Sequence, residues 1–403
     1  MRPQLGIAAG AVLLVLTSCS SSDSGSGATA TNGGTSGDGV GGSSAAGGSH
    51  ASGGASGTST SNAGSPNSNG GAGGAANASG GHGGLASGGT GTGGSTTGGS
   101  TSVSGAGGVA AGALPVIGGC TIFTADDAWN TPVTNETVDV AWTSKLQALV
   151  GAVNIHPDYG DATIGIPINV VSATQTKAAV TFDEPVESDP GPYAFPDPSV
   201  AKIEGGTPDN CDGDCHLLSV QQGSCMLFEA DGCAYQNGWR CYSGAIFDLK
   251  KNSYGQRTKG FTSADAAGLA ITPGLVRHDE AAAGAIHHAI RFTVPCTLDQ
   301  YVKPASHEAV PLKPPGCASN PNAVPMGLRV RLDLGVTAKN ASVAAQAVIT
   351  AMQTYGLILA DNGSSFYFQG EASSDWVDAT DIEPLKSIPA SAFKVVQVPP
   401  LEP

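Results

Sequence analysis

The chain has 403 residues, of which only 13% are charged, and its formal net charge is −15 at pH 7. A protein this acidic is repelled by phosphate backbones and anionic lipid headgroups, so nucleic-acid binding is excluded as its main function. Neutral sugars, peptides and cationic ligands remain open as partners.

Residues 1–18 have the pattern of a bacterial export signal. A positive Arg2 precedes an apolar segment at residues 5–16, which is shorter than the roughly 20 residues that span a bilayer. The sequence Leu-Thr-Ser-Cys at its end resembles a bacterial lipobox, with Cys19 as the palmitoylated residue. We therefore predict a lipoprotein anchored in the membrane through Cys19, and Ser20 favours the outer membrane and a surface-exposed domain. An ordinary secretory signal is the alternative.

Residues 19–112 consist almost entirely of Gly, Ser, Ala, Thr and Asn. Such a segment cannot bury enough apolar surface to offset its chain entropy, so it predicts a disordered tether. About 90 residues of Gly-rich chain have a reach of about 50 Å. Residues 113–403 are long enough for a sizeable core and form the predicted folded domain.

The cysteines fit an exported domain. Of the nine cysteines, all but Cys19 lie after residue 112, and an even number there predicts four disulfides. Cys296 and Cys317 are close in sequence and are expected to pair. Five others crowd into residues 211–241, so at least one pairs outside that cluster, and Cys120 is the simplest partner. A zinc site at Cys211, Cys215 and His216 is a weaker alternative.

Local patterns predict a mainly β domain, of the β-sandwich or jelly-roll kind, with a few helices. Helical spacing of apolar residues favours helices at residues 138–153 and 342–355, and a loop at 155–160 follows the first. Residues 216–229 and 357–368 are typical of hairpins, the second around Asp361-Asn362-Gly363. Further strands are expected at residues 164–171, 178–182, 244–249, 286–294, 301–302, 327–334 and 393–398, with 327–334 half exposed and antiparallel.

Residues 259–294 hold the densest group of charged side chains in the chain. Alternation along the predicted strand at 286–294 puts His288, Ile290, Phe292 and Val294 on one face and His287, Ala289, Arg291 and Thr293 on the other. Because His288 shares a face with apolar residues, we expect it to point inward and His287 to point outward.

Paired carboxyl groups in this stretch suggest glycoside hydrolysis, which needs one acid and one base or nucleophile. Asp265 and Glu280 are the candidates, and Arg277 and His288 would tune their pKa values. The structural alternative is an Arg277–Glu280 ion pair, an Asp265 turn cap and a core His288.

Candidate substrate-binding residues lie outside this pair. His216, His307 and Asp361 would contact polar groups, and Trp129 and Tyr193 would stack on sugar rings, although such aromatic residues are more often core. No cofactor is predicted; a structural Ca²⁺ bound by Asp209, Asp212 and Asp214 is an alternative that lacks the EF-hand spacing. The chain has no nucleophile-elbow, zincin or dinucleotide motif.

Several phrases together resemble a family of secreted actinobacterial and myxobacterial β-rich proteins. They are Ala-Trp-Asn at 128–130, His-Pro-Asp at 156–158, Ser-Asp-Pro-Gly-Pro-Tyr at 188–193, Ser-Gly-Ala at 243–245, Phe-Asp-Leu at 247–249, residues 259–294, and Ile-Leu-Ala-Asp-Asn-Gly at 358–363. The resemblance covers nearly all of residues 113–403 and implies a secreted β-rich domain, but no particular mechanism. The cysteine-rich segment at 211–241 departs from it.

The sequence therefore predicts a surface lipoprotein whose domain acts on extracellular polysaccharide, as a hydrolase with paired carboxylates. Two alternatives stay open. One is a glycan-binding or adhesion domain without catalysis. The other is a polysaccharide lyase with His288 or Tyr301 as base and Arg277 neutralising a uronate.

Overall fold

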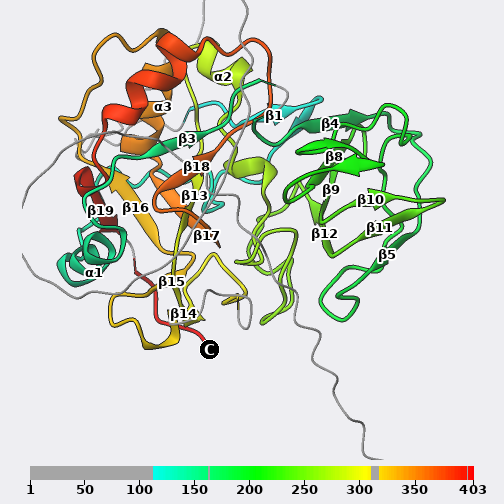
Figure 1. The fold of residues 1–403 in the computed structure, drawn as a ribbon, viewed down its shortest axis with the longest axis horizontal. Helices are drawn as coiled ribbons and strands as arrows, with labels where there is room; N and C mark the ends of the chain where they lie inside the picture. Colours follow the sequence, from blue (N-terminus) through cyan, green and yellow to red (C-terminus); the bar gives the residue numbers. More distant parts are fainter. Residues whose placement is uncertain (1–111, 162–163, 310–316, 397) are drawn as a thin grey trace, which may run out of the picture. The chain divides into compact units, whose positions relative to one another are not determined.

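The computed structural model describes residues 112–403 apart from 162–163, 310–316 and 397 (Figure 1). The predicted signal at residues 1–18, the predicted lipidation site at Cys19 and all but the last residue of the predicted tether lie outside this range. No helix in the described part of the chain is long and apolar enough to cross a membrane.

Strands outnumber helices, which confirms the mainly β, sandwich-like class with few helices (Figure 1). The largest sheet has six strands in the order β19-β16-β17-β13-β18-β3. Their bounds are β19 Phe393–Val396, β16 Arg329–Leu332, β17 Leu357–Asn362, β13 Ile290–Val294, β18 Tyr367–Gln369 and β3 His156–Asp158.

A second sheet has four strands in the order β12-β9-β8-β4, which are β12 Ser243–Asp248, β9 Met226–Asp231, β8 Leu217–Gln221 and β4 Ile168–Val171. A three-stranded sheet joins β10 Ala234–Tyr235, β11 Trp239–Cys241 and β5 Val180–Phe182. Short pairs complete the strands: β1 Val116–Ile117 with β2 Cys120–Thr121, β6 Gly206–Thr207 with β7 Asn210–Cys211, and β14 Thr297–Tyr301 with β15 Val324–Met326.

The described residues form three α-helices, which pack around the six-stranded sheet. In α1 (Val140–Val150) the Asp139 carboxylate accepts from the Trp142 amide, and in α3 (Val343–Thr354) the Ser342 hydroxyl accepts from the Ala345 amide. Both helices were predicted, and they contact β19 and β16 respectively. The five-residue α2 (His278–Ala282) was not predicted and packs against α3.

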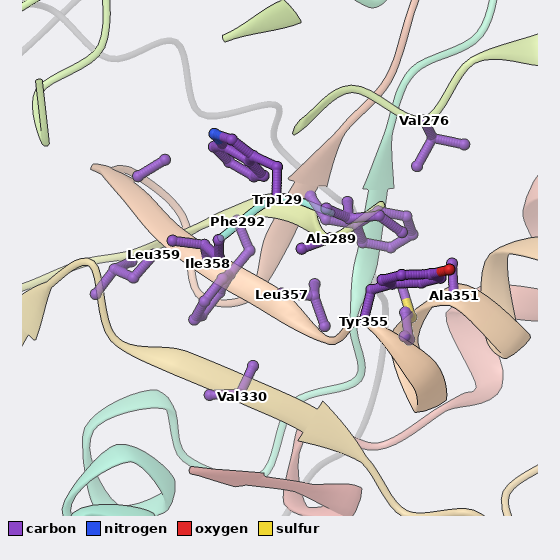
Figure 2. Packing of buried hydrophobic residues seen from close by; sticks show 14 of the residues in the cluster. Trp129, Val276, Ala289, Phe292, Val330, Ala351, Tyr355, Leu357, Ile358 and Leu359 are labelled. Carbon is purple, nitrogen blue, oxygen red and sulfur yellow. The ribbon is translucent and has the colours of Figure 1, made fainter. Parts of the chain in front are cut away.

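Strand β13 lies at the centre of the core. It runs parallel to β17 and antiparallel to β18, and all five of its residues are buried. Figure 2 shows Phe292 of this strand packed among Trp129, Ile358 and Leu359. Burial from both sides explains why the strand is rich in apolar and β-branched residues.

Four disulfides are present, as predicted. Cys296 pairs with Cys317, and Cys120 pairs with Cys225 beside the turn of the predicted β8–β9 hairpin. The other two pairs are Cys211–Cys215 and Cys233–Cys241. Because Cys211 and Cys215 are oxidised, the zinc site proposed on their thiolates is wrong.

Three local expectations differ from the structure. Strands β17 and β18 do not form a hairpin, because β13 lies between them, and Gly363 does not adopt a positive φ. Residues 156–158 form β3 rather than a loop, since they pair in parallel with β18. Arg329 is buried rather than exposed, because its guanidinium donates to the carbonyl oxygens of Ala128, Thr131 and Tyr355.

Candidate functional site

A polar cavity of about 250 Å³ lies where one face of the six-stranded sheet meets the segment that leads into β8. Most of its lining side chains are polar, and four of them are carboxylic acids. The lining residues are Asp158, Ile166, Glu204, Asp214, His216, Arg291, Thr293, Asp361, Asn362, Gly363, Ser364, Tyr367 and Gln369.

The sheet side of the cavity follows from strand alternation. Arg291 and Thr293 are two apart on β13, and Tyr367 and Gln369 are two apart on β18, so each pair points to the same face. Asp158 is in register with Gln369 on the neighbouring strand. The cavity therefore lies on the face of β13 that carries Arg291, opposite the apolar face of Phe292.

A β-bulge brings Asp361 to this face. Phe292 pairs with Leu359, but Thr293 pairs with Asp361, so Ala360 is the extra residue in β17. Paired residues share a side of the sheet, and the bulge thus places the Asp361 carboxyl group beside Thr293. Bulges are common next to active sites because they redirect one side chain.

Arg291 forms the floor of the site. Its Nε and Nη2 donate to the two carboxylate oxygens of Asp265 at 3.1 and 2.7 Å, and both side chains are almost fully buried. Nη2 also lies 3.8 Å from Oδ2 of Asp361. Burial alone would lower the pKa of Arg291, but the Asp265 carboxylate outweighs it and raises this pKa, so the guanidinium stays charged.

The carboxyl group of Asp361 is held in its protonated form. Burial raises its pKa to about 8, and the Asp265 charge adds to the rise while Arg291 opposes it. Its Oδ1 accepts from the Asn362 amide at 2.7 Å, and the side chain keeps 30% exposure. At neutral pH this group can therefore donate a proton to a ligand in the cavity.

Asp158 approaches the cavity from β3, at the other edge of this face. The pKa of Asp158 is raised, because burial outweighs the His156 charge and the hydrogen bond from Gln369 that favour the ionised form. Next to it, the Tyr367 ring stacks on His156 with 4.0 Å between centroids and 15° between planes. Tyr367 thus offers a fixed aromatic surface at the cavity wall.

Glu204 and His216 form the opposite wall. His216 Nδ1 contacts Glu204 Oε2, and its Nε2 lies 3.2 Å from the Ala264 carbonyl oxygen. Burial would lower the pKa of His216, but the charge and hydrogen bond of Glu204 raise it to about 10. An imidazolium at neutral pH cannot accept a proton, so His216 does not suit the role of general base.

The four residues predicted to be catalytic do not gather around one cavity. Glu280 lies between Arg277 Nη2 at 2.9 Å and His288 Nε2 at 3.0 Å, and this network is largely buried. Asp265 is bound to Arg291 behind the cavity wall. None of the four lines the cavity. The inward orientation expected of His288 is confirmed by its complete burial, and His287 is half-buried.

Of the five predicted substrate-binding residues, two line the cavity and three do not. His216 and Asp361 line the cavity. Trp129 and Tyr193 are fully buried, in contact with other core residues, so neither ring presents a face to a sugar. His307 is also largely buried, and its Nδ1 lies 2.7 Å from the Ala266 carbonyl oxygen.

Sequence reasoning missed two acidic residues of the cavity. Asp158 was assigned to a loop, although it ends a His-Pro-Asp phrase flanked by apolar residues. Glu204 precedes Gly205-Gly206, a local signal of close backbone approach that could have drawn attention to it. Comparisons with protein-family models, curated proteins and solved structures found no match for this chain.

Proposed function

We propose that the domain hydrolyses glycosidic bonds of extracellular polysaccharide in the polar cavity. The observation that carries the proposal is the placement of the Asp361 carboxyl group in a cavity that Asp158 and two further acidic side chains also line. Burial there raises the pKa of Asp361 to about 8 and so favours its protonated form at neutral pH. Pairs of carboxyl groups with different protonation states supply the acid and the base of this reaction.

In the proposed reaction Asp361 protonates the leaving glycosidic oxygen. The Asp158 carboxylate accepts a proton from the attacking water, whose oxygen forms the new bond to the anomeric carbon. Tyr367 supports one sugar ring, and the polar lining offers hydrogen-bond partners for hydroxyl groups. These roles replace the Asp265–Glu280 pair, because both of those carboxylates are bound by buried arginines.

Strand order bears on the stereochemistry. Asp361 is on β17 and Asp158 on β3, three strand spacings apart, which corresponds to about 14 Å between backbones. The side chains of both residues must extend toward each other across the sheet to act on one bond. Such an arrangement favours the carboxyl–carboxyl separation of about 6.5–9.5 Å, which leaves room for a water molecule, over the shorter separation of retaining enzymes. We therefore expect inversion at the anomeric carbon, which NMR of the first product detects.

Electrostatics favours a neutral glycan over a uronate. Four acidic side chains line the cavity, and the guanidinium of Arg291 is already engaged by Asp265. The residues required for the lyase alternative, His288, Tyr301 and Arg277, are almost completely buried. Hydrolysis of an uncharged polysaccharide therefore fits the cavity better than β-elimination.

A polysaccharide panel tests the proposal. Release of reducing ends is measured for the wild type, for Asp361→Asn and for Asp333→Asn, a change at a partly exposed carboxylate that does not line the cavity. Loss of an acid catalyst lowers such rates by about 10²–10⁴-fold, and the control is expected to retain the wild-type rate. Binding of a glycan without release by the wild type would instead favour the non-catalytic, glycan-binding alternative.

We further propose that the domain is presented at the cell surface by acylation of Cys19. The support is the lipobox-like sequence and the Gly/Ser-rich composition of the segment that follows. Two or three acyl chains provide stable anchoring, since each buried methylene contributes about 0.8 kcal/mol. A soluble or distant polysaccharide would then be within reach of a tethered enzyme.

A further inference from the structure

Three potential metal ligands converge on one wall of the cavity. Glu204 and Asp214 each offer a carboxylate oxygen and His216 offers a ring nitrogen, and the three atoms lie within 4.8 Å of one another. All three residues line the cavity. The carboxyl–proton chemistry proposed above needs none of them, so their convergence requires its own explanation.

The backbone holds these ligands in a compact arrangement. The Glu204 amide donates to the His216 carbonyl oxygen at 3.2 Å, and the Asp212 amide donates to the Gly205 carbonyl oxygen at 3.1 Å. Gly205 has φ +75°, and a β-carbon there would collide with the Asp212 carbonyl oxygen. Only glycine therefore allows the segment of Glu204 to lie this close to the segment of Asp214.

A disulfide constrains the loop that carries Asp214 and leads into His216. Cys211 and Cys215 are bonded across a short loop that contains Asp214, and His216 follows directly. Asp214 is exposed, whereas His216 is 4% exposed. The loop thus holds an exposed carboxylate beside a buried imidazole, and a cation entering from the cavity would contact both.

The orientation of His216 is that of a metal ligand. Its Nδ1 faces Glu204, while its Nε2 lies 3.2 Å from the Ala264 carbonyl oxygen and 3.8 Å from Asp231 Oδ1. Metal-binding histidines commonly donate their second ring N–H to a carbonyl or carboxylate, which fixes the ring and its tautomer. Ala264 and Asp231 occupy these positions around His216.

We propose that Glu204, Asp214 and His216 bind a divalent cation of the zinc or manganese type. The cation would replace the proton that His216 holds at Nδ1 in its ion pair with Glu204, and this proton would be released to solvent. One imidazole and two carboxylates suit these ions, whereas calcium prefers six to eight oxygen ligands. Three protein ligands leave a coordination position for water or a ligand oxygen, and the cavity lies on that side. This site differs from the calcium loop considered from the sequence, because Asp209 and Asp212 do not take part.

Isothermal titration of the untagged, full-length mature protein, after treatment with chelator, tests the site. Zn²⁺, Mn²⁺, Ca²⁺ and Mg²⁺ chlorides are titrated separately into the wild type, Asp214→Asn and Asp212→Asn. Asp212 lies in the same disulfide loop but outside the cluster, so it is the matched control. Because Asp214 is exposed, its replacement by the isosteric Asn should leave the fold intact, which circular dichroism verifies.

We expect one Zn²⁺ or Mn²⁺ per chain for the wild type and for Asp212→Asn. Affinity should fall at least about 100-fold in Asp214→Asn, since even loss of a group behind a ligand costs about 10–100-fold. Equal affinity in Asp214→Asn and the wild type, no binding by the wild type, or a preference for Ca²⁺ would overturn the proposal. The readout is independent of glycan hydrolysis, so the two proposals can fail separately.

Discussion

Two groups of charged side chains, a buried cluster and the acids that line the cavity, differ in where their charges are neutralised. In the buried cluster of Arg277, Glu280 and His288, each charged group has its partner inside the protein. In the cavity, by contrast, the carboxyl groups of Asp158 and Asp361 line an open space in which a ligand can form hydrogen bonds with them. High charge density in a sequence therefore identifies ion pairs as readily as sites, and function needs carboxyl groups that a ligand can reach.

Glu280→Gln should lower the stability of the domain strongly. The substitution removes the charge of the buried carboxylate that lies between Arg277 and His288, and the guanidinium keeps only Asp279, a largely exposed carboxylate 3.3 Å from its Nε. Arg277 Nη1 already has no hydrogen-bond partner in the described structure. Breaking such a buried pair lowers the free energy of unfolding by about 3–5 kcal/mol. Urea denaturation at neutral pH measures this loss. A free energy of unfolding within error of the wild type would show that the cluster is not a structural ion pair.

Asp265→Asn should change the pH dependence of hydrolysis. The Asp265 charge helps to raise the pKa of Asp361 to about 8, so the wild-type rate should fall as Asp361 loses its proton above that pH. Without this charge the pKa of Asp361 falls, and the alkaline limb of the rate profile moves to lower pH. An unmoved limb would show that another group controls the profile.

The sequence alone did not predict which charged side chains are buried as ion pairs and which line the cavity. Local patterns predicted α1, α3 and the β8–β9 hairpin, because helix caps and hairpin turns depend on nearby residues. Counting cysteines predicted that Cys120 pairs with one of the five cysteines at residues 211–241, and the structure shows that this cysteine is Cys225. These features could be predicted because they depend on neighbouring residues or on the number of cysteines.

The cavity depends on pairings between distant strands. Asp158 meets Gln369 through a parallel pairing, and Asp361 reaches the cavity through a bulge against β13. An Asn-Gly pair after Asp361 predicted a hairpin, but insertion of β13 between β17 and β18 determined the actual pairing. No local pattern specifies a neighbour that is tens of residues away.

A smaller effect is expected on the pH dependence of stability, where Asp361→Asn is compared with the wild type. The pKa of Asp361 is raised from 3.8 to about 8 in the folded protein, so the folded state holds this proton more tightly than the unfolded state. The resulting stabilisation is complete below about pH 4 and is lost as the pH rises through about 8. Asp361→Asn should therefore be relatively more stable than the wild type at pH 9 than at pH 4. Thermal unfolding at both pH values measures the difference, and parallel shifts would argue against a raised pKa.

Cys19→Ser should have the smallest effect on the domain itself. The substitution removes the thiol that we propose is acylated, so the protein should move from the membrane fraction to the soluble fraction, with an unchanged rate of hydrolysis per molecule. Immunoblots of cell fractions report the location. Retention of the Ser variant in the membrane fraction would contradict anchoring through Cys19.

The most direct test compares Asp361→Asn and Glu280→Gln on one polysaccharide substrate, with rates normalised to the folded fraction of each variant. If the chemistry belongs to the cavity, Asp361→Asn should lose about 10²–10⁴-fold in rate while Glu280→Gln keeps the wild-type rate per folded molecule. A full rate in Asp361→Asn together with loss of rate in Glu280→Gln would assign the chemistry to the buried cluster and contradict this account.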